Sequence, residues 1–378
     1  MIDGDELAAW LRLVATPGVG RDTARRLLAQ FGSPEGVLRA STAALRPFAG
    51  EATAAALAAE PEGFAELLAA TRAWLAVSPA GEPGGRDVLV LGDPRYPRTL
   101  LETADPPTLL YVDGRIEVLQ ADSIAVVGSR NPTAQGVENA RAFASHLSRA
   151  GLVVVSGLAL GIDGAAHEGA LEGQAASGTG GTIAVVGTGL DLVYPARHRA
   201  LAHRIATAGL LVSEFPIGTA SRPENFPIRN RIIAGLARGT LVVEAALRSG
   251  SLITARLALE AGREVFAIPG SIHSPQARGC NALLEQGAKL VDSAVDILEE
   301  FGAPKVPAVG RETAADASGS DRPDPVLAAL GFDPVGLDEL VARTGMGAAE
   351  LSARLLELEL AGRIARLPGQ MFRRVERG

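Results

Sequence analysis

The chain has 378 residues, a hydrophobic content of 47%, an aromatic content of 4% and a formal net charge of −7. This length predicts roughly two or three domains, and the acidic total favours nucleic-acid binding only where positive charge gathers locally. Cys280 is the only cysteine, which excludes an internal disulfide and a multi-cysteine zinc site. No apolar run reaches the ~18 residues of a membrane span, and the acidic start MIDGDELAAW lacks a signal-peptide pattern. We therefore expect a cytoplasmic protein.

Residues 1–78 are expected to form a helical domain of the SAM or helix-hairpin-helix type. Two apolar stripes have helical spacing: Leu7, Leu11 and Val14, then Ala24, Leu27, Leu28 and Phe31. The segment between them, TPGVG at 16–20, is a turn that requires glycine conformations. Such a turn resembles a helix-hairpin-helix, whose backbone amides contact DNA phosphates, but it also fits a plain turn in a helical adaptor domain. The stretch PAGEPGG at 79–85 has the composition of a linker.

Residues 87–301 alternate between apolar strands and helix-length segments. The expected strands are 124–127, 152–155, 182–186, 210–212, 240–243, 264–268 and 289–291, with 88–91 as a possible edge strand. Apolar runs without polar alternation are what strands buried on both faces require. We therefore predict an α/β domain of the extended Rossmann-like type, with a doubly wound, mainly parallel sheet.

The last part of the chain is predicted to be a linker followed by a winged helix. Residues 302–323 are polar and rich in Ala, Pro and Gly, which is typical of a linker. In residues 324–378, helices at 337–344 and 348–361 form a helix-turn-helix, and strands at 363–367 and 371–375 form a hairpin. The second helix carries Glu350, Glu357 and Glu359 against Arg354 alone, so a phosphate groove would repel it. We expect an interaction or regulatory module, with a weak contact of the basic hairpin to DNA left open.

The first candidate site is Gly128-Ser129-Arg130, directly after an expected strand. Glycine lets the backbone approach an anion, while the Ser129 hydroxyl, the amides of the next helix and the Arg130 charge suit a phosphate. The alternative is a tight strand-to-helix turn without a ligand. A second glycine-rich loop, SGLALGIDGAAH at 156–167, places Asp163 and His167 four residues apart. A capping Asp and a structural His explain this spacing better than catalysis or metal binding, because no third ligand has suitable spacing.

The third candidate site is a basic stretch at 222–238. It contains Arg222, Arg229, Arg231 and Arg238 against the single acid Glu224, with Phe226 among them. Arginines beside an exposed aromatic ring supply phosphate neutralisation and base stacking, the two terms of single-strand recognition. The alternative is that Phe226 belongs to the core. Farther along, Ser249-Gly250-Ser251 opens a helix and offers another anion site.

These segments resemble the DprA/Smf (DNA-processing protein A) family. The match covers about residues 88–301 and rests on GSR, SGLALGID, GTGLDLVYP, SEFP, FPIRNRIIAGL, VVEA, SGSLITA and FAIPG in the family's order. The resemblance implies single-stranded DNA binding, a homodimer formed through the Rossmann-like domain, and loading of RecA recombinase in natural transformation or DNA recombination. It implies no catalytic residue, cofactor or metal. The segment 172–182 is longer than the family's usual turn at this place.

The expected DNA-binding residues combine the anion loops with the family's GSR and FPxRNR motifs. They are Gly128, Ser129, Arg130, Arg222, Asn225, Phe226, Arg229, Asn230, Arg231, Ser249, Gly250 and Ser251.

An enzymatic alternative comes from the same architecture. Glu244 at a strand end and the following Ser-Gly-Ser resemble nucleoside monophosphate N-glycosidases of the lysine-decarboxylase-like superfamily. Their PGGxGTxxE signature is absent here, and only Gly239-Thr240 and Glu244 match fragments of it. A shared fold alone does not decide between binding and catalysis.

Overall fold

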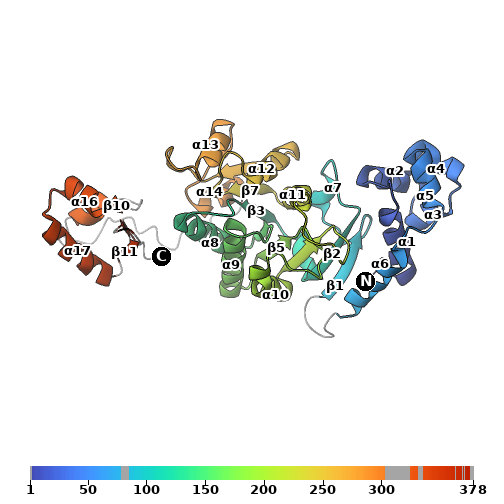
Figure 1. Ribbon diagram of the computed structural model, residues 1–378, viewed down its shortest axis with the longest axis horizontal. Helices are drawn as coiled ribbons and strands as arrows, with labels where there is room; N and C mark the ends of the chain where they lie inside the picture. The colour runs from blue at the N-terminus through green and yellow to red at the C-terminus, as the bar shows by residue number, and fades with distance from the viewer. Residues whose placement is uncertain are drawn as a thin grey trace. The chain divides into compact units, whose positions relative to one another are not determined.

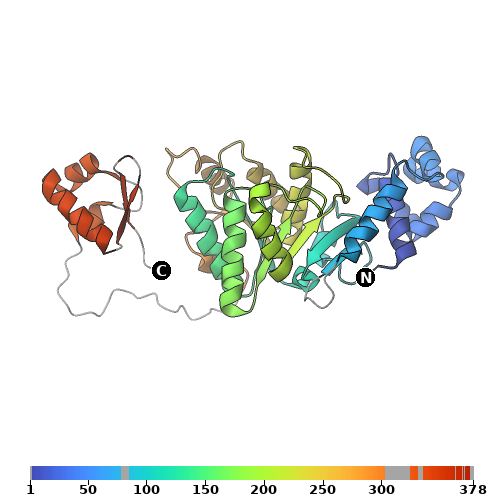
Figure 2. The same ribbon diagram turned by 60° about the horizontal axis from the view of Figure 1, so that its bottom comes forward.

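The computed structural model describes residues 2–77, 85–302, 324–330, 335–361, 363–367, 369 and 371–374. The chain forms two compact units, Met1–Val306 and Pro307–Gly378, and each is considered by itself (Figures 1 and 2). Most of the two predicted linkers, 79–85 and 302–323, lies outside the described residues, which include only residues 85 and 302 of them. Among the residues that are described, no helix is long and apolar enough to span a membrane.

The N-terminal segment is helical, as its apolar stripes predict. Within residues 2–77 the helices are α1 (Gly4–Ala15), α2 (Arg21–Phe31), α3 (Pro34–Arg39), α4 (Thr42–Ala49), α5 (Glu51–Leu57) and α6 (Phe64–Ala76). Ser33 and Ser41 cap α3 and α4 by accepting a backbone N–H three residues ahead, which is the usual serine cap. The turn between α1 and α2 holds Gly18 at φ 84°, a conformation that favours glycine.

The central sheet contains nine strands within the described residues 85–302, in the order β1-β2-β6-β5-β4-β3-β7-β8-β9. In chain order they are β1 (Gly85–Val90), β2 (Leu109–Gly114), β3 (Ser123–Val127), β4 (Val153–Ser156), β5 (Gly181–Val185), β6 (Leu210–Ser213), β7 (Gly239–Val242), β8 (Glu264–Ala267) and β9 (Lys289–Leu290). Pairing is parallel from β6 to β9, and β1 and β2 are antiparallel. The mainly parallel α/β fold is confirmed, and the expected edge strand at 88–91 is β1. The sequence prediction missed β2.

Helices cover both faces of the sheet because each central strand is apolar on both sides. On β3, Ile124 and Val126 belong to one core cluster while Ala125 and Val127 belong to another. One face carries α8 (Ala134–Arg149), α9 (Ile162–Ser177), α10 (Arg199–Ala208) and α14 (Ala294–Glu300). The other carries α7 (Arg98–Leu101), α11 (Asn225–Leu236), α12 (Gly250–Glu260) and α13 (Arg278–Glu285). Short 3-10 turns occur at Ile116–Gln120 and Ala196–His198. Cys280 of α13 is fully buried.

The helical segment shares a hydrophobic core with the antiparallel edge of the sheet. Leu7 and Trp10 of α1 and Trp74 of α6 cluster with Val88 of β1 and Tyr111 of β2. The Trp74 and Tyr111 rings meet edge to face with centroids 5.9 Å apart. The helices and the edge strands are therefore joined by apolar packing, so that they form one compact unit.

The second unit has the predicted winged-helix order. Its described elements are α15 (Pro325–Leu330), β10 (Val335–Gly336), α16 (Leu337–Thr344), α17 (Ala348–Leu360), β11 (Ile364–Leu367) and β12 (Met371–Arg374), with strand order β10-β12-β11. Gly345 ends α16 in a left-handed conformation, at φ 69°. Arg354, the arginine of α17, is paired with Asp324 and with Glu357, so its charge is already neutralised by carboxylates.

Candidate nucleic-acid interface

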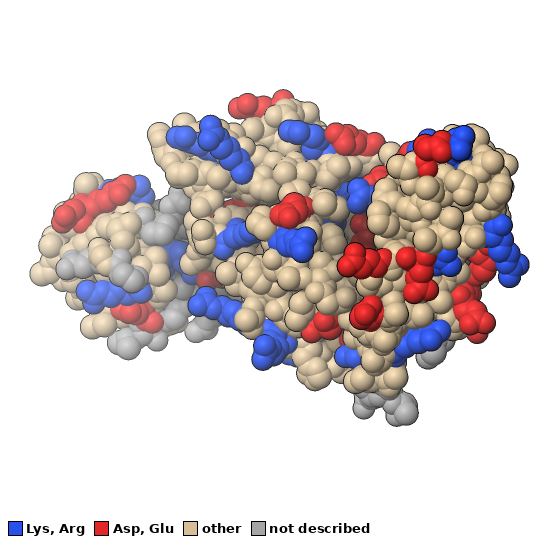
Figure 3. All heavy atoms as spheres, turned by 45° about the vertical axis from the view of Figure 1, so that its right-hand side comes forward, with Lys and Arg blue, Asp and Glu red and all other residues tan. Residues whose placement is uncertain are grey.

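A cavity of about 650 Å³ opens at the carboxyl ends of β3 and β7, the edge where parallel α/β sheets bind ligands. It is lined by the loop after β3, the first half of α11 and the loop between β7 and α12. Nine of the twelve expected residues line it: Gly128, Ser129, Arg130, Phe226, Arg229, Asn230, Ser249, Gly250 and Ser251. Figure 3 shows acidic and basic side chains interspersed on the face that it displays.

The loop after β3 is held by close backbone packing. The Ser129 amide donates to the carbonyl oxygen of Glu244 at 2.7 Å, and the Ser129 hydroxyl accepts from the amide of Asn131 at 3.1 Å. A Cβ atom on Gly128 would lie 2.6 Å from Ile162 Cγ1, so only glycine fits at this position. The adjacent Arg130 side chain is exposed. The loop therefore presents an exposed guanidinium from a closely packed backbone.

The N-terminus of α8 differs from the expected phosphate cradle. The Glu244 carboxylate accepts from the Thr133 amide at 2.9 Å and from the Thr133 hydroxyl at 2.5 Å. Thr133 in turn caps α8 by accepting the amide of Gly136. A carboxylate already occupies part of the positive end of this helix, which leaves less of it for a phosphate. The same contacts give Glu244 a structural role and do not favour the glycosidase alternative.

Phe226 lies at the wall of the cavity and is half-buried, so it is not a core residue. The Arg130 guanidinium carbon lies 5.2 Å from the centroid of its ring, within cation–π distance. The ring of Tyr194 lies 5.6 Å from the same centroid at an interplanar angle of 37°. Tyr194 is 50% exposed and also lines the cavity. Two aromatic rings and one arginine therefore form a continuous wall.

Arg229 is buried beneath the cavity, although from the sequence we expected it to lie beside the DNA path. It is 3% exposed, and its Nη1 donates to the carbonyl oxygen of Val185 on β5. A Cβ atom on Gly157 would lie 1.9 Å from that nitrogen, so any other residue there would displace the Arg229 guanidinium. Burial lowers the pKa of Arg229 to about 10, although the nearby Asp163 carboxylate acts in the opposite direction. Arg229 thus ties α11 to the sheet, and its charge is shielded from the surface.

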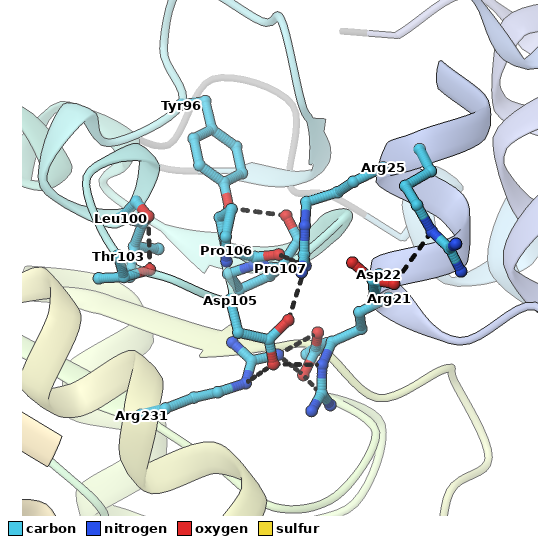
Figure 4. A network of polar contacts seen from close by, with 12 residues as sticks. Arg21, Asp22, Arg25, Tyr96, Leu100, Thr103, Asp105, Pro106, Pro107 and Arg231 are labelled. Atoms are coloured by element: carbon cyan, nitrogen blue, oxygen red, sulfur yellow. Dashed lines mark hydrogen bonds and ion pairs between the residues drawn. The ribbon is translucent and has the colours of Figure 1, made fainter. Parts of the chain in front are cut away.

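The remaining expected residues lie outside the cavity lining. Arg231 points to another side of α11, where it pairs with Glu214 and Asp105 (Figure 4). Asn225 is buried and donates its side-chain amide to Gly187 O at 2.9 Å, whereas Arg222 is exposed. The sequence prediction grouped these residues with Phe226 because they are neighbours in the chain.

The α12 side of the cavity carries short polar groups. Ser249 caps α12 by accepting the amide of Ser251 at 3.3 Å, and the two hydroxyl oxygens lie 2.7 Å apart. The side-chain amide of Asn230 lies 3.4 Å from Gly250 O, which links α11 to this loop. Serine hydroxyls can reorient to donate or accept, so this side suits phosphate or sugar oxygens.

The lining residues that were not among the expected ones include Tyr194 and Arg248. Tyr194 lies in the GTGLDLVYP motif, which carried the family resemblance but received no role. Arg248 directly precedes Ser249 and is exposed. Both could have been found from the sequence, because each is an aromatic or polar residue that adjoins a glycine-rich loop at the end of a strand.

The turn between α1 and α2 faces the central domain. Val19, Gly20 and Arg21 line a second cavity of about 720 Å³ together with Asp105 and Glu214. Arg21 and Arg25 at this end of α2 form ion pairs with Asp105. These arginines already have carboxylate partners, which argues for the adaptor interpretation of the hairpin over phosphate contact.

Asp163 and His167 are structural residues, but Asp163 is not the expected helix cap, because it lies inside α9, whose N-cap is Gly161. Asp163 accepts the amides of Gly157 and Ala159 at 3.1 and 3.3 Å, so it orders the preceding loop. The His167 Nε2 atom accepts the Leu158 amide at 3.3 Å, which leaves Nδ1–H to donate to the Thr182 hydroxyl at 2.7 Å. Within the described residues, no group of three His, Cys, Asp or Glu side chains is arranged to hold a metal ion.

The fold and these loops define a Rossmann-like α/β protein with a C-terminal winged helix. The family described as DNA recombination-mediator protein A matches residues 87–302, and the DprA winged helix domain matches residues 310–370. The chain therefore belongs to the DNA-processing protein A (DprA/Smf) family.

Individual relatives agree with this assignment. The chain is similar to protein Smf of Escherichia coli K12, with 45% identity over 284 residues, covering 74% of this chain and 75% of that protein. Its structure is similar to that of DNA processing protein A from Streptococcus pneumoniae, with a TM-score of 0.66 and 36% identity. The match covers 79% of this chain and 98% of that chain. It is also similar to DNA processing protein A from Helicobacter pylori, in a structure described for its single-stranded DNA binding mode. For this second structure the TM-score is 0.51 and the identity 28%, and the match covers 58% of this chain and 96% of that chain.

The buried His167 predicts a pH dependence of stability. Burial lowers its pKa to about 3, and the positive charges of His198 and Arg229 act in the same direction. An unfolded chain binds this proton near pH 6.5, so His167 stabilises the fold above that pH and the contribution is lost as the pH falls toward 3. Between pH 6 and 5, the stability of the wild type should fall relative to His167→Asn by about 1.4 kcal/mol per pH unit. Urea unfolding at several pH values measures this difference.

The exposed His203 provides the matched control. The variant His203→Gln is measured beside His167→Asn to control for the loss of a histidine as such. Parallel curves for the wild type and His167→Asn would show that His167 is not the neutral buried group that the hydrogen bonds require.

Proposed function

We propose that the cavity at the carboxyl ends of β3 and β7 binds single-stranded DNA, and that the protein delivers this strand to RecA recombinase in natural transformation or DNA recombination. The observation that carries the proposal is the wall formed by Arg130, Phe226 and Tyr194. The similar DNA processing protein A of Helicobacter pylori binds single-stranded DNA, which supports the same activity here.

The cavity offers both terms of single-strand recognition. Exposed Arg130 and Arg248 can neutralise phosphates, while the rings of Phe226 and Tyr194 can stack on bases. The hydroxyls of Ser129, Ser249 and Ser251 and the Asn230 amide can bond phosphate and sugar oxygens. Stacking tolerates every base, so we expect little sequence preference. Oligo-dT and a duplex of equal length, compared at two salt concentrations, test this function directly.

A homodimer formed through the Rossmann-like domain is part of the proposal. A dimer would place two such cavities on one particle. Strand β9 forms an open edge of the sheet and its Leu290 is 58% exposed, so this edge is compatible with pairing of two sheets. Delivery to the recombinase rests on the family resemblance. Light scattering measures the oligomeric state, and a strand-exchange assay with RecA on coated single strands measures the delivery.

Arg130→Ala should weaken oligo-dT binding without destabilising the fold, because the side chain is exposed and reaches the cavity from a rigid loop. We expect a loss of about 1.5–3 kcal/mol, and a salt slope smaller by about 0.7 if one phosphate contact disappears. Fluorescence anisotropy titrations at several salt concentrations measure both quantities. Arg149→Ala, at an exposed arginine at the end of α8, should bind like the wild type. Unchanged affinity of a folded Arg130→Ala variant would reject the role of Arg130.

Phe226→Leu separates stacking from packing, because leucine keeps apolar volume and removes the ring face. If the ring stacks on a base, affinity should fall by ~1–3 kcal/mol while the melting temperature barely changes, and Tyr194→Leu should behave alike. Phe48→Leu is the control, since Phe48 forms an aromatic pair with Phe31 at 5.8 Å in the helical segment. A large drop in melting temperature with intact binding would instead assign Phe226 to packing.

The winged helix is expected to contribute little to this binding. On α17, Glu350, Glu357 and Glu359 outnumber Arg354, whose charge is already paired with two carboxylates. A chain ending at Phe301 should therefore bind oligo-dT within about threefold of the full-length protein. The comparison requires that both proteins be folded and of equal oligomeric state. A tenfold loss would show that this module holds DNA despite its charge.

A further inference from the structure

We infer that Arg21 and Arg25 of the helical segment are positioning residues for the DNA cavity: they complete a charge cluster that holds α11 in place. The inference rests on the proposed function, because α11 carries Phe226 and Asn230 to the cavity. The cluster, hereafter the α11 charge cluster, consists of Arg21, Arg25, Asp105, Glu214 and Arg231. Figure 4 labels all of these except Glu214.

Asp105 is the centre of the α11 charge cluster. Its carboxylate meets Arg21 Nε at 2.7 Å, Arg25 Nη1 at 2.6 Å and Arg231 Nε at 3.2 Å. Arg25 also donates to the carbonyl oxygen of Pro106 at 3.1 Å. One carboxylate from the segment before β2 thus joins two arginines of α2 to one arginine of α11.

Glu214 connects the same arginines from the other side. Arg231 Nη2 lies 2.5 Å from Glu214 Oε1, and Arg21 Nη1 lies 3.7 Å from Glu214 Oε2. The side chains of Arg231 and Glu214 are each only 13% exposed. Burial raises the pKa of Glu214 despite the neighbouring arginines, and burial also lowers the pKa of Arg231. Both groups therefore need well-placed partners to stay charged.

The central domain alone does not balance these charges. It supplies two carboxylates, Asp105 and Glu214, against the single guanidinium of Arg231. Arg21 and Arg25 convert a cluster with one excess negative charge into one with an excess positive charge. Without Arg21 and Arg25, two carboxylates would share the single guanidinium of Arg231, and a partly buried carboxylate without a full partner is costly. We therefore expect the arrangement of Arg231 to depend on the docking of α2.

The geometry of α11 transmits this constraint to the cavity. Arg231 follows Phe226 by five residues, roughly 140° around the helix, so cavity and cluster lie on different sides of one rigid element. Arg229 and Asn230, between them in the chain, line the cavity. A shift of α11 at Arg231 would therefore displace the aromatic wall, although Arg21 and Arg25 do not line the DNA cavity.

The test compares Arg21→Gln/Arg25→Gln with wild type in the full-length protein, using oligo-dT affinity, its salt slope and the melting temperature. The double variant should bind roughly three- to thirtyfold more weakly, the usual range for coupled sites, with an unchanged salt slope because no phosphate contact is removed. Arg25→Lys keeps the positive charge, so its oligo-dT affinity should be closer to that of the wild type than to that of the double variant. Arg26→Gln is the matched control, because Arg26 is exposed on the same helix and pairs with Asp22.

A double-mutant cycle with Phe226→Leu separates positioning from a general loss of stability. If the arginines act through α11, the glutamine substitutions should cost less affinity in the Phe226→Leu background. Should the double variant fail to fold, Arg25→Gln alone is compared in the same cycle.

Three results would overturn the inference while leaving single-strand binding by the wild type intact. The first is an oligo-dT affinity of the double variant within twofold of that of Arg26→Gln. The second is an equal loss of affinity in the wild-type and Phe226→Leu backgrounds. The third is a salt slope reduced by about 0.7 per substituted arginine, which would mean direct phosphate contact. A wild-type protein that does not bind oligo-dT would instead reject the proposed function, and the inference with it.

Discussion

The candidate site depends on one buried arginine whose guanidinium packs directly against a glycine. Arg229 reaches from α11 to the end of β5 and passes over Gly157, where any Cβ atom would overlap its guanidinium. Asp163 orders the same loop through the Gly157 and Ala159 amides. Helix α11, two loops and the sheet edge are thereby fixed to one another, and the exposed groups of the cavity are mounted on that frame.

The paired and unpaired arginines explain how an acidic chain, with a net charge of −7, can offer a site for a polyanion. Arg229 and Arg231 are engaged in internal contacts with the sheet and with carboxylates. Arg130 and Arg248 are exposed at the cavity and are the charges that a strand could meet. Binding at such a site would depend on these local charges and little on the sign of the total charge.

The fold was largely predictable from sequence, and the site only in part. Apolar runs locate strands buried on both faces, and glycine-rich loops mark the strand ends. The sequence therefore placed Gly128, Ser129 and Ser249 in loops at strand ends, where the structure has them at the cavity. Strand β2 was missed because it follows Pro106-Pro107 and ends in Asp113-Gly114, a turn-like context. The direction of Arg229 and Arg231 depends on partners that lie 44 and 17 residues away in the chain, which local sequence cannot supply.

Cys280 gives the molecule a practical property for spectroscopy. Burial raises the pKa of its thiol to about 12, and Sγ lies 3.5 Å from the Val242 carbonyl oxygen. A thiol that stays protonated and shielded reacts slowly with maleimide dyes. Because it is the only cysteine of the chain, a new cysteine on the surface could be labelled selectively without removing the native one. Dye pairs between the helical segment and α11 would then report their separation directly in solution, with and without a bound strand.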